Sequence, residues 1–326
     1  MRLNAVFQMK IRKQKRMNVT IESRARPCPG VEHAIAMAED ALRHGSKVFS
    51  VGELIHNSRE IGRLKKLGLS EITAEELGDP KMKDEFEDAS LLIRAHGESE
   101  HVIDLARDAG LNILNATCPI VTHSQTVIDQ HVDDGWGVVI VGRPDHPETM
   151  ALLDRTHGNG VVISSLEEAN VAELEERSLL LAQSTANPDL FHDICKELSS
   201  RISGLKIMDT TCRFIRTRQK DIQTFAEDQD IVLVIGGKKS SNCRLLYEKA
   251  KSQNELTFRL QSPDDIDWTW FKDGEKVGVT GGASTPKWQL EEIRSSLENH
   301  KIEKNPKGLK NRKGGKFLWW MRKNPK

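Results

Sequence analysis

Three cysteines lie where a predicted buried strand ends and a helix begins. Cys118 follows the apolar segment 112–114 and precedes Pro119 and a helical pattern. Cys212 occupies a similar junction, and Cys28 occupies a looser version of it. The intervals between the cysteines are also similar, at 118 − 28 = 90 and 212 − 118 = 94 residues. This repetition indicates three similar blocks that meet at one site.

Three thiolates at separate junctions can bind an iron–sulfur cluster, because the positive ends of three helices stabilise its anionic sulfur. Three ligands for a four-iron cube leave one iron without a protein ligand, and that iron can act as a Lewis acid. The alternative is three buried thiols that pack as small apolar side chains. The repeated junction favours the cluster. Cys195 and Cys243 lie within predicted helices, and we interpret them as structural.

Polar side chains also follow the predicted strands. They occur where a strand ends and a loop or helix begins, at His56, His96, His146, Glu148, Ser184, Ser240, Asn242 and Ser284. In parallel α/β sheets, ligands bind at this edge. We therefore expect these groups to face one cavity.

The histidines, together with an amide and the hydroxyls at 240, 241 and 284, indicate a pocket for phosphate or diphosphate. The ordinary alternative is that residues 240–242 only cap the helix that follows. Glu148 can relay protons to a leaving hydroxyl, or it can be a capping acid in a first helical turn. The segment 236–240 lacks the spacing of a Walker A loop, and no GxGxxG motif opens a helix.

The elements that must position these groups alternate between strand and helix with short connections, as in parallel α/β units. The predicted strands are 19–21, 47–51, 90–93, 112–114, 137–141, 161–164, 179–182, 231–235 and 276–280. We expect an α/β fold of three pseudo-repeated domains with parallel sheets. Their expected bounds are 30–118, 119–209 and 210–300, with the strand in 17–29 added to the last.

Composition limits the function classes. Lys and Arg number 48 against 48 Asp and Glu, and aromatic residues make up 5%, so neither a nucleic acid nor a membrane partner is indicated. No apolar run approaches the roughly 18–20 residues of a membrane span. Residues 1–16 form a basic extension without a signal-peptide core, and Met17 is an alternative start. Residues 301–326 form a basic tail that we expect to be disordered. Five cysteines without a CxxC pair indicate reduced thiols and a cytoplasmic protein.

With these motifs, the chain resembles the 4-hydroxy-3-methylbut-2-enyl diphosphate reductase family, the LytB/IspH type. Nine matching stretches follow the family's order across roughly residues 17–300. They are 28–31, 56–57, 95–97, 116–119, 146–148, 183–185, 212 with 218–219, 240–242 and 282–286.

The resemblance implies a trefoil of three α/β domains around a central 4Fe–4S cluster, with one iron lacking a protein ligand. Cys28, Cys118 and Cys212 would hold the cluster, and Glu148, linked to the hydroxyl of Ser184, would deliver protons. The diphosphate would be held by His56, His96, Ser240, Ser241, Asn242 and Ser284, with His146 close by. Reduced ferredoxin or flavodoxin would supply two electrons, and the products would be isopentenyl and dimethylallyl diphosphate.

The chain departs from the family pattern near the cysteines. Arg26-Pro27 precedes the first cysteine where the family has glycine and an aromatic residue, and Ser184 replaces a threonine. Phe214 lies two residues after Cys212, and His123 occupies a position where the family usually has lysine. Two alternatives therefore stay open. One is a paralogue acting on another hydroxylated diphosphate, and the other is a cluster-binding sensor whose basic tail docks on nucleic acid.

Overall fold

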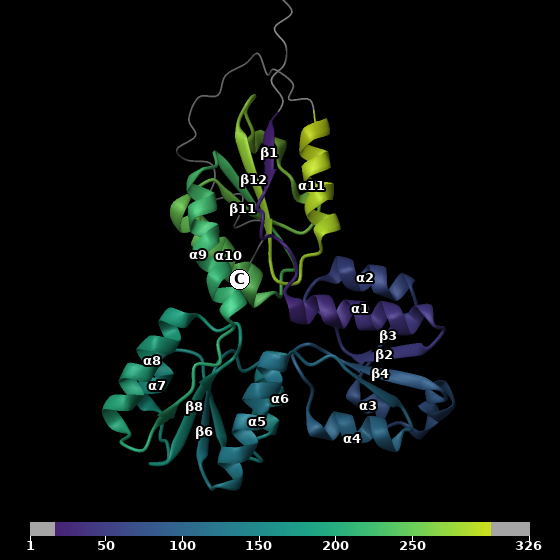
Figure 1. Cartoon of the computed structure of the whole chain (residues 1–326), viewed down its shortest axis with the longest axis vertical. Coiled ribbons are helices and arrows are strands. Elements are labelled where there is room, and N and C mark those ends of the chain that lie inside the picture. Colours follow the sequence, from purple (N-terminus) through teal and green to yellow (C-terminus); the bar gives the residue numbers. More distant parts are fainter. Residues whose placement is uncertain (1–16, 301–326) are drawn as a thin grey trace, which may run out of the picture.

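The computed structural model describes residues 17–300, which form three four-stranded parallel sheets with helices on their faces (Figure 1). The first sheet and its helices comprise α1 (Pro29–Arg43), β2 (Lys47–Val51), α2 (Ser58–Lys66), β3 (Leu69–Ile72), α3 (Ala74–Leu77), β4 (Ala89–Ile93), α4 (Glu100–Asp108) and β5 (Asn112–Asn115). The second set comprises α5 (Pro119–Asp133), β6 (Gly137–Val141), α6 (Pro147–Asp154), β7 (Gly160–Ile163), α7 (Leu166–Val171), β8 (Ser178–Ala182), α8 (Pro188–Arg201) and β9 (Lys206–Ile207). The third comprises β1 (Asn18–Ile21), α9 (Arg213–Glu227), β10 (Ile231–Ile235), α10 (Ser241–Gln253), β11 (Thr257–Leu260), β12 (Lys276–Gly281) and α11 (Lys287–Asn299). The predicted basic extension and basic tail lie outside the described residues.

The three sheets share one topology. Their strand orders are β3-β2-β4-β5, β7-β6-β8-β9 and, read from the other edge, β11-β10-β12-β1. In each sheet, the first strand of the block (β2, β6 or β10) lies between the second and the third strand. The fourth strand pairs with the third and forms the other edge of the sheet. The third block takes its fourth strand from the start of the described chain, because β1 pairs with β12 in parallel register. The predicted α/β class with three parallel sheets is confirmed.

Burial explains which strands could be predicted. In β4, β6, β8 and β10 every residue is buried, because helices cover both faces of a parallel sheet. Every predicted strand is present to within one residue at each end. The edge strands β3 and β11 were missed, because the sequences LSEI and TFRL mix polar and apolar residues.

The same strand positions deliver the same kinds of side chain to the centre. The fourth strands β1, β5 and β9 lead to Cys28, Cys118 and Cys212. The two inner strands of each sheet lead to polar side chains. These are His56 and His96 in the first block, His146, Glu148 and Ser184 in the second, and Ser240, Ser241, Asn242 and Ser284 in the third.

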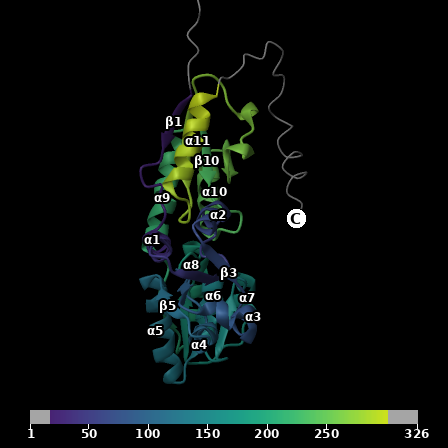
Figure 2. The ribbon, with the colours of Figure 1, turned by 90° about the vertical axis from the view of Figure 1, so that its right-hand side faces the viewer.

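Figure 1 shows the three blocks as lobes that meet near the starts of α1 and α9. Seen from the side, the first two blocks overlap below the third, so that the molecule is elongated and narrow (Figure 2). Within residues 17–300, no helix combines the length and the apolar character needed to cross a membrane.

Candidate active site

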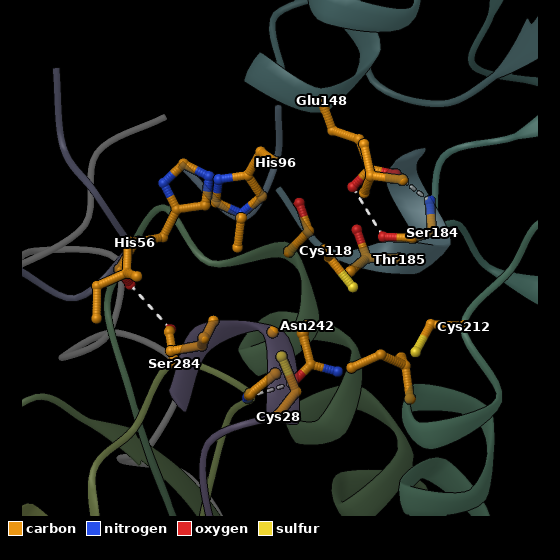
Figure 3. Close-up of a pocket in the computed structure, with 18 of the residues that line it drawn as sticks. Cys28, His56, His96, Cys118, Glu148, Ser184, Thr185, Cys212, Asn242 and Ser284 are labelled. Atoms are coloured by element: carbon orange, nitrogen blue, oxygen red, sulfur yellow. Dashed lines mark hydrogen bonds between the residues drawn. The ribbon is translucent and has the colours of Figure 1, made fainter. Parts of the chain in front are cut away.

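One cavity at the meeting point of the three sheets brings together every residue that the sequence indicated for a site (Figure 3). It is lined by Cys28, His56, His96, Cys118, His146, Glu148, Ser184, Cys212, Ser240, Ser241, Asn242 and Ser284. In the close-up, His56 and His96 lie on the side of Ser284, whereas Cys118 and Cys212 lie on the opposite side, near Ser184.

The cavity therefore has two chemically different ends. We call the part formed by Cys28, Cys118 and Cys212 the sulfur end. We call the part formed by His56, His96 and His146 the imidazole end.

At the sulfur end, each cysteine is the N-cap residue of a helix. Cys28, Cys118 and Cys212 precede α1, α5 and α9, and in the described chain none of their side chains makes a capping hydrogen bond. Their backbone N–H groups donate to carbonyls of other cavity residues. The acceptors are those of Ala283 at 2.9 Å, Ala95 at 3.0 Å and Ser184 at 2.8 Å. The backbone is thus fixed while the three sulfur atoms remain available as ligands.

The thiols at this end influence one another. Burial, with a smaller contribution from the neighbouring Cys118 and Cys212, raises the pKa of Cys28 to about 11, although the backbone N–H groups of Val31 and Gly30 in α1 oppose the shift. Burial also raises the pKa of Cys118, while two N–H groups of α5 lower it. Neighbouring thiols at helix N-termini can serve as a donor set for a cationic metal group, whose binding would displace the thiol protons.

At the imidazole end, the three rings lie in mutual contact. The ring centroids are 4.9 Å apart for His56 and His96, 5.2 Å for His56 and His146, and 5.3 Å for His96 and His146. Both ring nitrogens of His56 and Nδ1 of His96 are buried and have no hydrogen-bond partner among the described residues. Buried polar atoms are rarely left unpaired, so this cluster indicates a polar ligand.

Burial disfavours the protonated form of all three imidazoles. Burial, together with the charges of Arg94 and Arg143, lowers the pKa of His56 to about 4. Burial likewise lowers the pKa of His146 to about 3, and that of His96 to well below its usual range. A bound anion has the opposite effect, because it stabilises the protonated ring.

A metal ion is a second option for this cluster, since one nitrogen of each ring lies within 4.8 Å of the others. His146 argues against it. Its Nδ1 accepts the backbone N–H of Glu148 at 3.2 Å, so the proton of the neutral ring resides on Nε2. A histidine that binds a metal usually donates its second ring N–H to an acceptor. The arrangement is better suited to donating to an anion than to holding a cation.

Two side chains of the third block, those of Ser284 and Asn242, are oriented by hydrogen bonds at the imidazole end. The hydroxyl of Ser284 donates to the backbone carbonyl of His56 at 3.3 Å. The side-chain oxygen of Asn242 accepts the N–H of Ala283 at 2.7 Å. This leaves Nδ2 of Asn242 buried and unpaired within the described structure. That amide is a free donor at the cavity wall.

Ser240 and Ser241 have local partners as well. Ser240 caps α10 by accepting the backbone N–H of Cys243 at 3.2 Å, as its ordinary interpretation predicts, and it also lines the cavity. The hydroxyl of Ser241 accepts a hydrogen bond from Nη1 of Arg143 at 3.1 Å. Both hydroxyls therefore combine a structural contact with a place in the cavity wall.

Glu148 is the buried acid of the cavity. Its side chain accepts the backbone N–H of Ser184, and the Ser184 hydroxyl donates to its Oε2 at 2.8 Å. Burial raises the pKa of Glu148 to about 7, although both hydrogen bonds from Ser184 oppose the shift. A carboxyl with this pKa exchanges a proton readily at neutral pH.

Two polar residues lie in the matching stretches 183–185 and 56–57 but were not predicted as site residues. Thr185 lines the cavity directly after Ser184, and its place in that stretch was the available signal. Asn57 follows His56 and is buried against Ser284, a contact between residues 227 apart that no local pattern indicates. Cys195 lies on α8, away from the residues that line the cavity.

Comparison with known proteins identifies the family. A model described as LytB protein matches residues 19–298. The chain belongs to the LytB family. The resemblance seen in the motifs is thereby confirmed.

Among curated LytB relatives, the chain is 32% identical over 287 residues to the 4-hydroxy-3-methylbut-2-enyl diphosphate reductase of Aquifex aeolicus (strain VF5), covering 86% of this chain and 96% of the relative. It is 34% identical over 289 residues to the protein of the same name from Bacteroides fragilis (strain ATCC 25285), with coverage of 86% and 98%.

Solved structures agree. The structure of an (E)-4-hydroxy-3-methyl-but-2-enyl diphosphate reductase, the terminal enzyme of the non-mevalonate pathway, aligns with a TM-score of 0.65 and 32% identity, over 86% of this chain and 99% of that chain. The E-1-hydroxy-2-methyl-but-2-enyl-4-diphosphate reductase of Plasmodium falciparum gives a TM-score of 0.76 at 20% identity, over 86% and 87%, and shows the shared fold.

The departures from the LytB pattern leave the cavity intact. Cys28 lines it despite the preceding Arg26-Pro27, because its backbone N–H is held by Ala283. Phe214 packs against the apolar cluster that contains Cys212. This ring replaces nothing in the donor set and adds apolar cover beside the sulfur end.

Proposed function

We propose that this LytB protein reduces 4-hydroxy-3-methylbut-2-enyl diphosphate to isopentenyl and dimethylallyl diphosphate. Each turnover takes up two electrons and two protons, breaks the bond between carbon and the allylic hydroxyl, and releases one water. The observation that carries this conclusion is a single cavity that combines three thiols, three imidazoles and a buried carboxyl. The relatives that bear this activity in their names cover nearly the same length of chain.

We assign the sulfur end to a 4Fe–4S cluster held by Cys28, Cys118 and Cys212. The residues fit such a group, because the three sulfur atoms line one cavity at helix N-termini and have no capping role within residues 17–300. When bound, the cluster supplies electrons and, at the iron that three thiolates leave without a protein ligand, a Lewis acid.

We assign the imidazole end to the diphosphate. His56 and His96 offer buried nitrogens that lack partners among the described residues, and Asn242 offers an unpaired amide N–H. A diphosphate satisfies these groups and favours protonation of the rings, so that hydrogen bonds become charge-assisted. The hydroxyls of Ser240 and Ser284 lie in the same wall.

Glu148 serves as the proton donor. Its pKa of about 7 keeps a proton on the carboxyl in a substantial fraction of molecules at neutral pH. The hydroxyl of Ser184, bonded to Oε2 at 2.8 Å, orients the carboxyl. We assign the electrons to a small carrier, a reduced ferredoxin or flavodoxin, in a cytoplasmic setting that keeps the thiols reduced.

The test is anaerobic turnover. The purified protein, with its iron content measured, receives 4-hydroxy-3-methylbut-2-enyl diphosphate and reduced methyl viologen, and dye oxidation is followed with product analysis. We expect brown protein with about four irons per chain and formation of both products. Brown protein that turns over another hydroxylated diphosphate but not this one would instead identify a paralogue. Colourless protein after anaerobic reconstitution would overturn the assignment of the sulfur end.

A further inference from the structure

We propose that Asn57 and Gln289 form a buried amide pair that positions His56 and Ser284 relative to each other. Gln289 thereby sets the affinity for the substrate. The inference rests on the proposed diphosphate site. Asn57 follows His56 at the start of α2, and Gln289 lies in the first turn of α11. The pair therefore joins the first block to the third.

The two side chains bond to each other in both directions. Nδ2 of Asn57 donates to Oε1 of Gln289 at 3.1 Å, and Nε2 of Gln289 donates to Oδ1 of Asn57 at 3.0 Å. Their exposed fractions are only 2% and 1%. A reciprocal amide pair fixes both planes, and burial makes each bond costly to leave unmade.

Asn57 uses its remaining hydrogen-bonding capacity on the same structure. Its Nδ2 also donates to the backbone carbonyl of Ser284 at 2.8 Å. Its Oδ1 also accepts the backbone N–H of Glu60 at 3.2 Å, which caps α2. All four hydrogen-bonding sites of this amide are thus occupied, so the side chain has one orientation.

These contacts hold His56 of the imidazole end and Ser284 beside it. Ser284 also bonds to the first block: its hydroxyl donates a hydrogen bond to the backbone carbonyl of His56 at 3.3 Å. On its other side, the loop of His56 lies against Gly237, where an added Cβ would lie 2.2 Å from that carbonyl oxygen. His56 is therefore enclosed by the third block, and Gln289 fixes the register between His56 and Ser284.

The same interface offers a control at a neighbouring, more exposed residue. Trp288, next to Gln289 on α11, donates Nε1 to Oε2 of Glu60 at 2.8 Å. Glu60 is also bound by Arg63, so Trp288→Phe removes one interface hydrogen bond while the carboxylate keeps a partner. Neither Trp288 nor Glu60 lines the cavity.

The experiment compares Gln289→Leu and Trp288→Phe in anaerobically purified holoenzyme. For Gln289→Leu we expect the KM for the substrate and the Kd for inorganic diphosphate each to rise about tenfold. We expect kcat to change less than about twofold and the iron content to be unchanged, since no group of the sulfur end is touched. For Trp288→Phe we expect both KM and Kd to stay at the wild-type values.

Equal effects of the two variants, or a lowered unfolding midpoint in Gln289→Leu with unchanged KM and Kd, would overturn the proposal in favour of a purely structural interface. Should Gln289→Leu not fold, Gln289→Glu tests the same point, because it keeps the shape and one acceptor but loses the donor to Asn57. The wild-type turnover assay separates the two ideas. Loss of diphosphate affinity in the variant without substrate turnover by the wild type would refute the proposed function and leave the positioning role standing.

Discussion

The sulfur end and the imidazole end of the cavity are held in place by different means. At the sulfur end, each cysteine is fixed by the backbone, through an N-cap position and an N–H bond to Ala283, Ala95 or Ser184. At the imidazole end, both ring nitrogens of His56 and Nδ1 of His96 lack partners in the described structure, and His146 accepts a backbone N–H, that of Glu148. The position of His56 depends on contacts with the third block, through Ser284 and Gly237. A group of fixed geometry needs backbone-fixed ligands, whereas an anion that enters and leaves needs groups that can change their protonation. The two ends should therefore respond differently to substitution.

The largest expected effect breaks the sulfur end alone. Cys118→Ser removes one of the three proposed ligands, so we expect loss of the cluster, measured as iron and acid-labile sulfide content, and turnover reduced to background. Cys195→Ser is the control, because Cys195 lies on α8 outside the cavity, and it should retain both iron and activity. Full iron content and activity in Cys118→Ser would refute the ligand assignment.

The next largest effect is on kcat in Glu148→Gln, which tests proton delivery without altering the proposed cluster ligands. Glu148→Gln keeps the shape of the side chain but removes its exchangeable carboxyl proton, so we expect kcat to fall about 10²- to 10⁴-fold. The visible spectrum and iron content should remain those of the wild type, and KM should change little. Single-turnover and steady-state kinetics on the reduced protein measure this. An unaltered kcat would move the proton donor to another group.

The imidazole end should affect affinity instead. In His96→Asn, a ring that stacks on His56 and meets His146 edge-on is replaced by a shorter amide. We expect KM to rise about 10- to 100-fold, as for loss of a charge-assisted bond. Iron content should not change, because no sulfur ligand is altered. A loss of iron equal to that in Cys118→Ser would abolish the distinction between the two ends.

The smallest effect concerns pH. Because burial raises the pKa of Glu148 to about 7, the protonated form prevails below that pH and declines above it. We expect kcat/KM, which reports ionisations of the free enzyme, to fall about tenfold between pH 6 and pH 8, in proportion to the protonated fraction. The residual kcat/KM of Glu148→Gln should lack this dependence. A wild-type kcat/KM that rises across this interval would contradict the role of Glu148 as proton donor.

The sequence predicted what local patterns encode. Strands such as β6 and β10 are uniformly apolar, and their ends placed His146 and Ser240 at the edge that also holds Cys118, after the end of β5. What it could not predict depends on contacts between distant segments. The edge strands β3 and β11 bury only some of their residues, so their composition resembles that of a loop. Asn57 and Gln289 are 232 residues apart, and their pairing follows from the docking of α2 on α11. The local sequence around either residue does not indicate it.

The most direct test of the two-ended cavity is a crystal structure of the anaerobically purified protein with bound 4-hydroxy-3-methylbut-2-enyl diphosphate. The account predicts a 4Fe–4S cluster on the sulfur atoms of Cys28, Cys118 and Cys212. It also predicts the diphosphate among the imidazoles of His56, His96 and His146 and the hydroxyl of Ser284. A diphosphate bound elsewhere, or a metal ion coordinated by the three imidazoles in place of the anion, would contradict it.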